Sequence, residues 1–166
     1  MTAYANLRGV MPAILTPMDA EGRFLPGAFE QLLEFVYTRG ADGIYVCGQT
    51  GEGLQQPVAQ RKLVVESAVQ HTPSGKFVMA HIGAPSTADA VELARHAESC
   101  GAHSISSLPP GGSYSIDEVH GYYSAIAAAT SCSWSSSSNT AASPADNRAG
   151  CRTPTGRRAT SWPPAP

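Results

Sequence analysis

The chain has 166 residues, enough for one domain with a hydrophobic core, and 42% of them are hydrophobic. Its net charge of −2 gives no reason to expect a nucleic acid or a membrane as a partner, and no apolar run approaches the roughly 18 residues of a membrane helix. The four cysteines show no metal-binding spacing, so we expect no metal and no cofactor. No signal peptide is visible, so we expect a cytoplasmic protein with reduced thiols.

The first predicted elements are a strand, a helix and a second strand. Residues 9–15 (GVMPAIL) are apolar throughout, as in a strand that is covered on both faces, although Pro12 is awkward there. Residues 26–39 predict a helix, because their apolar side chains recur at intervals of three and four and Gly40 follows as a stop. The short apolar run 43–47 predicts the second strand.

The same order continues through the next unit. Residues 57–71 predict a second helix, with a proline in its first turn, where a missing N–H costs nothing. A third strand is predicted over residues 77–82. A third helix follows over residues 86–99, with Ser86 as its N-cap.

The last predicted unit is a fourth strand over residues 103–108 and a fourth helix over residues 115–129. Ser115 and Glu118 form a capping-box pattern at the start of this helix. Four strand–helix units of about 30 residues in strict alternation favour an α/β fold with a parallel sheet and right-handed helical crossovers.

The turn of residues 48–53 (GQTGEG) follows the second predicted strand and is the strongest candidate for a binding site. Its three glycines allow close approach of the backbone or a positive φ, and Thr50 and the loop amides are potential hydrogen-bond donors. The order G-x-x-G-x-G without lysine matches neither nucleotide-binding loop, and Glu52 would repel a polyphosphate. The turn therefore predicts a site for a single carboxylate, unless it is only a turn.

Other polar residues receive structural interpretations. His81, at the end of the third predicted strand, is interpreted as a satisfied, half-buried histidine, and Glu52 as an acceptor for loop amides rather than a general base. Cys47 is interpreted as a small hydrophobe. The remaining histidines show no metal-ligand spacing and receive no role: His71, His96 and His120, which we expect to be solvated, and His103.

The composition changes after Thr130. Residues 131–166 contain no Leu, Ile, Val, Met, Phe or Tyr and carry a net charge of +3, against −5 for residues 1–130. Such a segment cannot bury enough surface to offset the entropy of ordering, so we expect a disordered low-complexity tail. It is either a natural tail or the product of a frameshift after Thr130. If a frameshift occurred, the serines at residues 135–138 could be encoded by repeated UCG codons. Read in the shifted frame, the same nucleotides give GUC, the codon for valine, and a run of valines would form a fifth buried strand.

Several stretches of residues 9–130, taken in order and with their spacing, resemble the dihydrodipicolinate synthase / N-acetylneuraminate lyase family. The matching stretches are residues 9–17 (GVMPAILTP), 48–52 (GQTGE), Gln60-Arg61, 78–83 (VMAHIG), 88–94 (ADAVELA) and 108–110 (LPP). The resemblance implies that residues 1–130 are the N-terminal half of a TIM (β/α)8 barrel, the first four strand–helix units of a fold that needs about 250 residues.

The resemblance also implies a chemistry. Family members are class I aldolases or lyases, in which a lysine at the end of the sixth strand forms a Schiff base with pyruvate or another 2-oxo acid. A tyrosine at the end of the fifth strand moves the proton. By analogy Thr50 contacts the substrate carboxylate, with help from the backbone of Gln49 and Gly51. Full-length relatives form homo-oligomers.

The chain departs from the family pattern in three ways. Gln49 replaces a Ser or Thr that relays a proton, and residues 111–114 (GGSY) replace a common pair of tyrosines. The only lysines, Lys62 and Lys76, lie in a helix and before a strand, where neither can be the nucleophile. We therefore expect this chain alone to be catalytically inactive. The alternatives are a 2-oxo acid binding module, and a half-barrel that self-associates or aggregates through its open edges.

Overall fold

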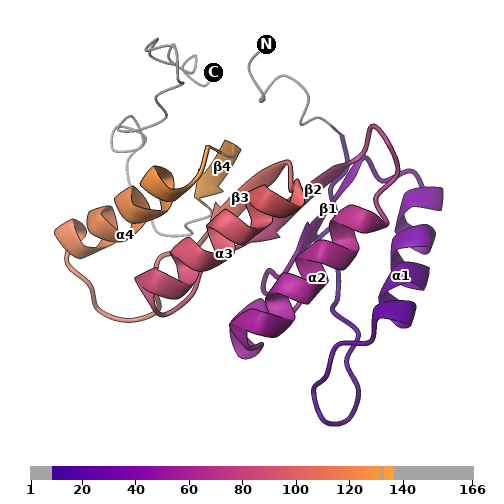
Figure 1. The fold of residues 1–166 in the computed structure, drawn as a ribbon, viewed down its shortest axis with the longest axis horizontal. Coiled ribbons are helices and arrows are strands. Elements are labelled where there is room, and N and C mark those ends of the chain that lie inside the picture. The colour runs from indigo at the N-terminus through magenta and orange to yellow at the C-terminus, as the bar shows by residue number, and fades with distance from the viewer. Residues whose placement is uncertain (1–8, 132, 137–166) are drawn as a thin grey trace, which may run out of the picture.

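The computed structural model describes residues 9–131 and 133–136, which form a parallel four-stranded sheet in the order β1-β2-β3-β4 with helices between the strands (Figure 1). The strands are β1 (Gly43–Val46), β2 (Phe77–His81), β3 (Ser104–Ser107) and β4 (Ser133–Ser136). The helices are α1 (Pro26–Thr38), α2 (Val58–Gln70), α3 (Thr87–Cys100), α4 (Ile116–Ala129) and the short 3-10 helix η2 (Gly53–Gln55).

The predicted helices and strands between residues 26 and 129 are confirmed, with ends that differ by one residue. Local signals fix several of these ends. The Ser115 side chain accepts from the Glu118 N–H while the Glu118 carboxylate accepts from the Ser115 N–H, which completes the capping box of α4. Gly101, with φ of +90°, ends α3 in the left-handed conformation that glycine adopts without strain.

The strand predicted over residues 9–15 is wrong, because the structure has only an isolated bridge between Ala13 and Tyr45 there. The segment still runs beside β1: Ile14 donates to the Tyr45 carbonyl at 3.1 Å and Tyr45 donates to the Pro12 carbonyl at 2.9 Å. A regular ladder would next need an N–H from Pro12 to the carbonyl of Gly43. Proline has no N–H, so the ladder stops.

The expectation that order ends after residue 130 is wrong for Ser133–Ser136. This stretch forms β4, which pairs in parallel with β3 from Ser104↔Ser133 to Ser107↔Ser136. The free edge of β3 offers backbone donors and acceptors to any extended segment, whatever its side chains. The remainder of the expected tail, residues 137–166, lies outside the described residues.

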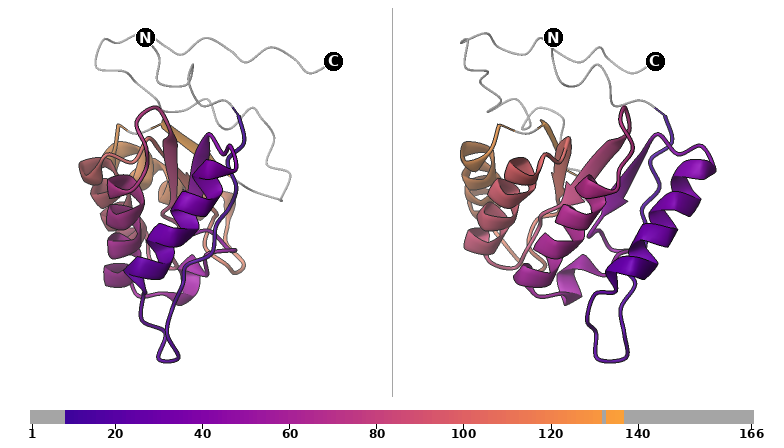
Figure 2. Two further views of the ribbon diagram at one scale, coloured as in Figure 1. Left: turned by 90° about the vertical axis from the view of Figure 1, so that its right-hand side faces the viewer. Right: turned by 45° about the vertical axis from the view of Figure 1, so that its right-hand side comes forward.

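The helices α2, α3 and α4 cover one face of the sheet, and no described helix covers the other face (Figures 1 and 2). The core lies between these layers and includes the buried strand residues Ile44, Val46, Val78, Ala80 and Ile105. Side chains alternate along a strand, so Tyr45 and Met79, which are only partly buried, belong to the uncovered face. No described helix is both long and apolar enough to cross a membrane.

Candidate functional site

The glycine-rich turn lies directly after β1, at the carboxyl end of the sheet, where parallel α/β folds bind their ligands. Gln49 and Thr50 are exposed, whereas Gly51 is buried. The backbone N–H groups of these three residues and the Thr50 hydroxyl donate no hydrogen bond within residues 9–131 and 133–136. Successive amide donors in a turn form a concavity that attracts anions.

The carbonyl groups of the turn other than that of Thr50, in contrast, accept hydrogen bonds from described residues. Glu52 donates its N–H to the Gln49 carbonyl at 3.0 Å, and Gly53 donates to the Gly48 carbonyl at 3.0 Å. These bonds close the turn onto the start of η2. The donors of the turn therefore remain available while the acceptors named here are internally satisfied.

The carbonyl of Gly51 joins the turn to the preceding strand-like segment. It accepts from the Thr16 hydroxyl at 2.8 Å and from the Gln56 side-chain amide at 2.6 Å, and both side chains are buried. Sequence reasoning gave neither residue a role in the site. The position of Thr16 at the end of the apolar run 9–15, beside the turn in a parallel arrangement, is the signal that could have found it.

The glycines of the turn serve close packing rather than positive φ. The left-handed residues are Cys47 (φ 57°) and Glu52 (φ 53°). A Cβ at Gly53 would overlap the Cys47 carbonyl, and one at Gly48 would lie 2.7 Å from the Tyr45 ring. The side chain of Glu52 is exposed and forms no cap for η2, so its expected role as an acceptor for loop amides is wrong.

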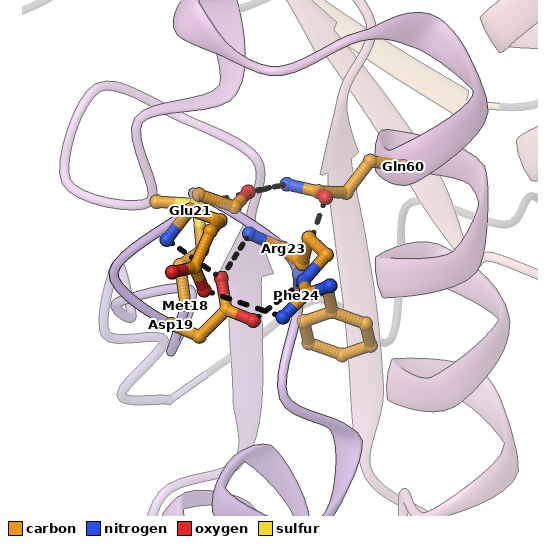
Figure 3. A network of polar contacts seen from close by, with 7 residues as sticks. Met18, Asp19, Glu21, Arg23, Phe24 and Gln60 are labelled. Atoms are coloured by element: carbon orange, nitrogen blue, oxygen red, sulfur yellow. Dashed lines mark hydrogen bonds and ion pairs between the residues drawn. The ribbon is translucent and has the colours of Figure 1, made fainter.

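The loop from Met18 to Phe24 precedes α1 and contacts Gln60 of α2 (Figure 3). The Asp19 carboxylate accepts from the backbone N–H of Arg23 at 2.8 Å and from its Nε at 2.7 Å; these bonds lower the pKa of Asp19. The Gln60 side chain on α2 accepts from the Phe24 N–H at 3.1 Å. This attachment holds the loop, and with it Thr16, beside the turn.

Arg61 is a buried cation at the same end of the sheet. Arg61 is 2% exposed, and its guanidinium donates to the carbonyl of His81, the last residue of β2, at 2.7 Å and to that of Gly83 at 2.9 Å. Burial lowers the pKa of Arg61, and no described carboxylate pairs with it. The charge of Arg61 also acts on the Cys47 thiol just before the turn, where it partly offsets the rise in the pKa of Cys47 that burial causes. An uncompensated buried cation favours an anionic ligand nearby.

The prediction that His81 is a satisfied, half-buried histidine is wrong in both respects, because His81 is fully buried and its Nδ1 has no hydrogen-bond partner among the described residues. Its ring is 3% exposed and its Nε2 accepts from the Leu108 N–H at 3.3 Å. Burial first, and the charge of Arg61 second, lower the pKa of His81 to about 4. The imidazole is therefore neutral near pH 7 and links the ends of β2 and β3.

Both lysines lie away from the turn, as predicted. Lys62 pairs with Glu92 across the outer surface of α2 and α3. Lys76 immediately precedes β2 and contacts Asp42 at 3.5 Å, at the amino end of the sheet. Neither ammonium group lies at the carboxyl ends of the strands, where the turn lies.

Two of the remaining histidines, His96 and His71, are less exposed to solvent than expected. His96 is only 17% exposed and contacts Glu66 at 2.8 Å, so the expectation of a solvated side chain is wrong. His71 is partly buried and contacts Glu30 at 3.2 Å. Both contacts connect neighbouring helices, which a one-dimensional pattern does not show.

The sequence profile of the dihydrodipicolinate synthetase family matches residues 6–134. The chain belongs to that family. A sialic acid aldolase from Ruminococcus gnavus has the same arrangement of elements, with a TM-score of 0.75 and 32% identity over 79% of this chain and 44% of the aldolase. The fold is therefore of the α/β TIM-barrel type.

Two further family relatives differ in their named activities. An N-acetylneuraminate lyase from Mediterraneibacter gnavus is 36% identical over 110 residues, 66% of this chain and 35% of the lyase. A dihydrodipicolinate synthase from Agrobacterium tumefaciens has a TM-score of 0.76 and 26% identity over 81% of this chain and 46% of the synthase. The matched part thus spans less than half of each of these relatives.

Proposed function

We propose that this chain is part of a lyase or aldolase of the Schiff-base type and that its glycine-rich turn binds the carboxylate of pyruvate or a related 2-oxo acid. The Thr50 hydroxyl and the backbone N–H groups of Gln49 and Gly51 are the donors. The observation that carries this proposal is the group of successive N–H donors without partners among the described residues, at the carboxyl end of β1.

The charges around the turn favour a ligand with one negative charge. The buried Arg61 supplies a positive charge that no described carboxylate offsets. Glu52, an exposed acidic residue of the turn, opposes a ligand that carries more negative charge. A monocarboxylate satisfies both conditions better than a phosphate or a polyphosphate.

We further propose that residues 1–130 correspond to the first four strand–helix units of a (β/α)8 barrel. The order of the elements and the likeness to the Ruminococcus gnavus aldolase support this assignment. Residues 131–166, of which Ser133–Ser136 joins the sheet as β4, would then be encoded after a change of reading frame. Sequencing the coding DNA tests the second part, since an alternative frame after codon 130 must encode a further strand–helix series.

This chain alone is proposed to lack aldolase activity, because no lysine is placed to form the Schiff base. Incubation with pyruvate and borohydride, followed by peptide mass spectrometry, tests this directly. We expect no covalent adduct. An adduct on Lys62 or Lys76 would contradict the proposal. That result would not decide whether the turn binds a carboxylate, which needs a separate test.

Pyruvate binding is tested by amide chemical shifts in a titration monitored by nuclear magnetic resonance. We expect the N–H signals of residues 49–51 to move with pyruvate but not with hydroxyacetone, which has a similar shape without the carboxylate. Equal movements with both compounds, or none at residues 49–51, would exclude the turn as the carboxylate site.

Self-association is a second candidate function, favoured by the uncovered sheet face and by the edge beside β1. Leu15 lies on this edge segment and is 59% exposed. If the edges join two copies, Leu15→Lys should lower the molar mass measured by light scattering, because edge lysines oppose strand pairing. Leu63→Lys, at a 54% exposed helix position, is the matched control. A monomeric parent protein at high concentration would exclude this function.

A further inference from the structure

Three side chains with metal-binding atoms converge on the outer surface of α2 and α3, remote from the turn. Glu66 comes from α2, and His96 and Cys100 come from α3. One ligand atom from each of the three lies within 4.8 Å of the other two. The family resemblance assigns no role to any of them.

The positions follow from helix geometry. His96 and Cys100 are four residues apart, so their side chains lie on the same face of α3, one turn from each other. Glu66 projects from the adjacent helix and is 49% exposed, while His96 is 17% exposed. The three ligands therefore rest on two packed helices, which hold them more rigidly than loops would.

The distances between the ligand atoms are close to those around a tetrahedral metal ion. His96 Nε2 lies 3.5 Å from Cys100 Sγ and 2.8 Å from Glu66 Oε1. Zinc–nitrogen and zinc–sulfur bonds of about 2.0 and 2.3 Å at a tetrahedral angle separate N and S by about 3.5 Å. The N–S distance already fits, and the N–O distance needs to open by roughly half an ångström, which an exposed glutamate allows.

We propose that Glu66, His96 and Cys100 form a binding site for a zinc-like divalent cation, with water in the fourth position. A thiolate and an imidazole select borderline metals such as Zn²⁺ and Co²⁺, whereas Mg²⁺ and Ca²⁺ prefer oxygen ligands. Cys100 binds as the thiolate and His96 as the neutral imidazole, so metal uptake releases the thiol proton to water.

A simpler role for these residues is a hydrogen-bonded contact between two helices. The pair of His71 and Glu30 illustrates that role, since it contains a histidine and a carboxylate at 3.2 Å without a thiol. What distinguishes the α2–α3 cluster is Cys100, whose Sγ lies 3.5 Å from the imidazole nitrogen that contacts the carboxylate and 3.7 Å from Nδ1 of the same ring. The two clusters within one chain provide an internal comparison.

Titration of the full chain with Co²⁺ tests the proposal, in a background with Cys132→Ser and Cys151→Ser. We expect a thiolate-to-cobalt charge-transfer band that Zn²⁺ abolishes. Cys100→Ser should remove the band, and His96→Gln and Glu66→Gln should weaken Co²⁺ binding by about tenfold or more. His71→Gln, the matched control, should bind like the parent.

A second measurement avoids substitutions at the cluster itself. Zn²⁺ should slow the alkylation of Cys100 by iodoacetamide several-fold, and Mg²⁺ should not; Cys47, which is 1% exposed, serves as the internal reference. The absence of the charge-transfer band with excess Co²⁺, or alkylation of Cys100 at the same rate with and without Zn²⁺, would overturn the metal site. If His96→Gln and His71→Gln weakened Co²⁺ binding equally, that result would also overturn the metal site.

Discussion

The Thr16 hydroxyl donates to the carbonyl of Gly51 at 2.8 Å, a buried hydrogen bond between residues 35 positions apart in the sequence. It joins the segment beside β1 to the middle of the glycine-rich turn. Because the Gln56 side-chain amide donates to the same carbonyl at 2.6 Å, the carbonyl of the buried Gly51 is fixed by two side chains. The shape of the proposed carboxylate site thus depends on residues outside the turn.

We predict that Thr16→Val lowers the free energy of unfolding by about 1–2 kcal/mol, because it removes one donor to a buried carbonyl without changing side-chain size. Denaturant unfolding measures the change. Thr38→Val is the matched control: the Thr38 hydroxyl is exposed and bonds only to carbonyls of its own helix. If both variants lose the same stability, the Thr16–Gly51 bond has no special role.

Arg61→Ala should lower the free energy of unfolding by about 3 kcal/mol or more, because it creates a cavity and leaves the carbonyls of His81 and Gly83 without their donors. Arg95→Ala, at an exposed position of α3, should change stability by less than about 0.5 kcal/mol. Equilibrium urea unfolding of both variants compares them, and similar losses would contradict the structural role of Arg61.

Stability should fall as the pH is lowered from 6.5 to 4, because of His81. The folded state holds the pKa of His81 at about 4, below its ordinary value of 6.5. In this interval the unfolded chain takes up a proton that the folded protein does not, which costs on the order of 3 kcal/mol of stability. The contribution of His81 is complete above pH 6.5, and His81 itself causes no further loss of stability below pH 4.

His81→Gln should reduce this pH dependence, since glutamine keeps an acceptor for the Leu108 N–H but does not titrate. His120→Gln, at an exposed position of α4, should retain it. Unfolding curves recorded between pH 4 and 7 give the slope of the free energy of unfolding against pH for each variant. An unchanged slope in His81→Gln would show that another group causes the acid sensitivity.

Ser115→Ala should lower the free energy of unfolding by about 1 kcal/mol, because it removes the N-cap of α4. Ser124→Ala, which removes an exposed hydroxyl from the middle of the same helix, should be neutral or slightly stabilising. Thermal unfolding monitored by circular dichroism compares the two. A smaller loss for Ser115→Ala than for Ser124→Ala would argue against the capping box.

The elements that could be predicted from sequence are those with local signals. The capping box at Ser115, the glycine after α3 and the apolar periodicity of α1 all act within a few residues, and the structure has these elements where they were expected. The segment at residues 9–15 was misassigned because a missing N–H at Pro12 outweighs its apolar character. The strand β4 could not be inferred from its side chains, since the pairing is through the backbone with β3.

The candidate site was predictable only in part. The donors at Gln49, Thr50 and Gly51 follow from the composition of the turn and from the family resemblance. The contacts of Thr16 and the burial of Arg61 depend on tertiary packing, so no local pattern indicates them. The same holds for the cluster on α2 and α3, where Glu66 is 30 residues from its histidine.

The most direct test of the carboxylate site is the affinity for pyruvate of the parent chain and of Thr50→Val, measured by calorimetric or spectroscopic titration. Valine keeps the size of the side chain and removes its hydroxyl donor. We predict that Thr50→Val weakens binding by about tenfold, equivalent to roughly 1.4 kcal/mol for a hydrogen bond to a charged group. Equal affinities of the two proteins, with the fold intact by circular dichroism, would contradict the assignment of the turn as the site of the 2-oxo acid carboxylate.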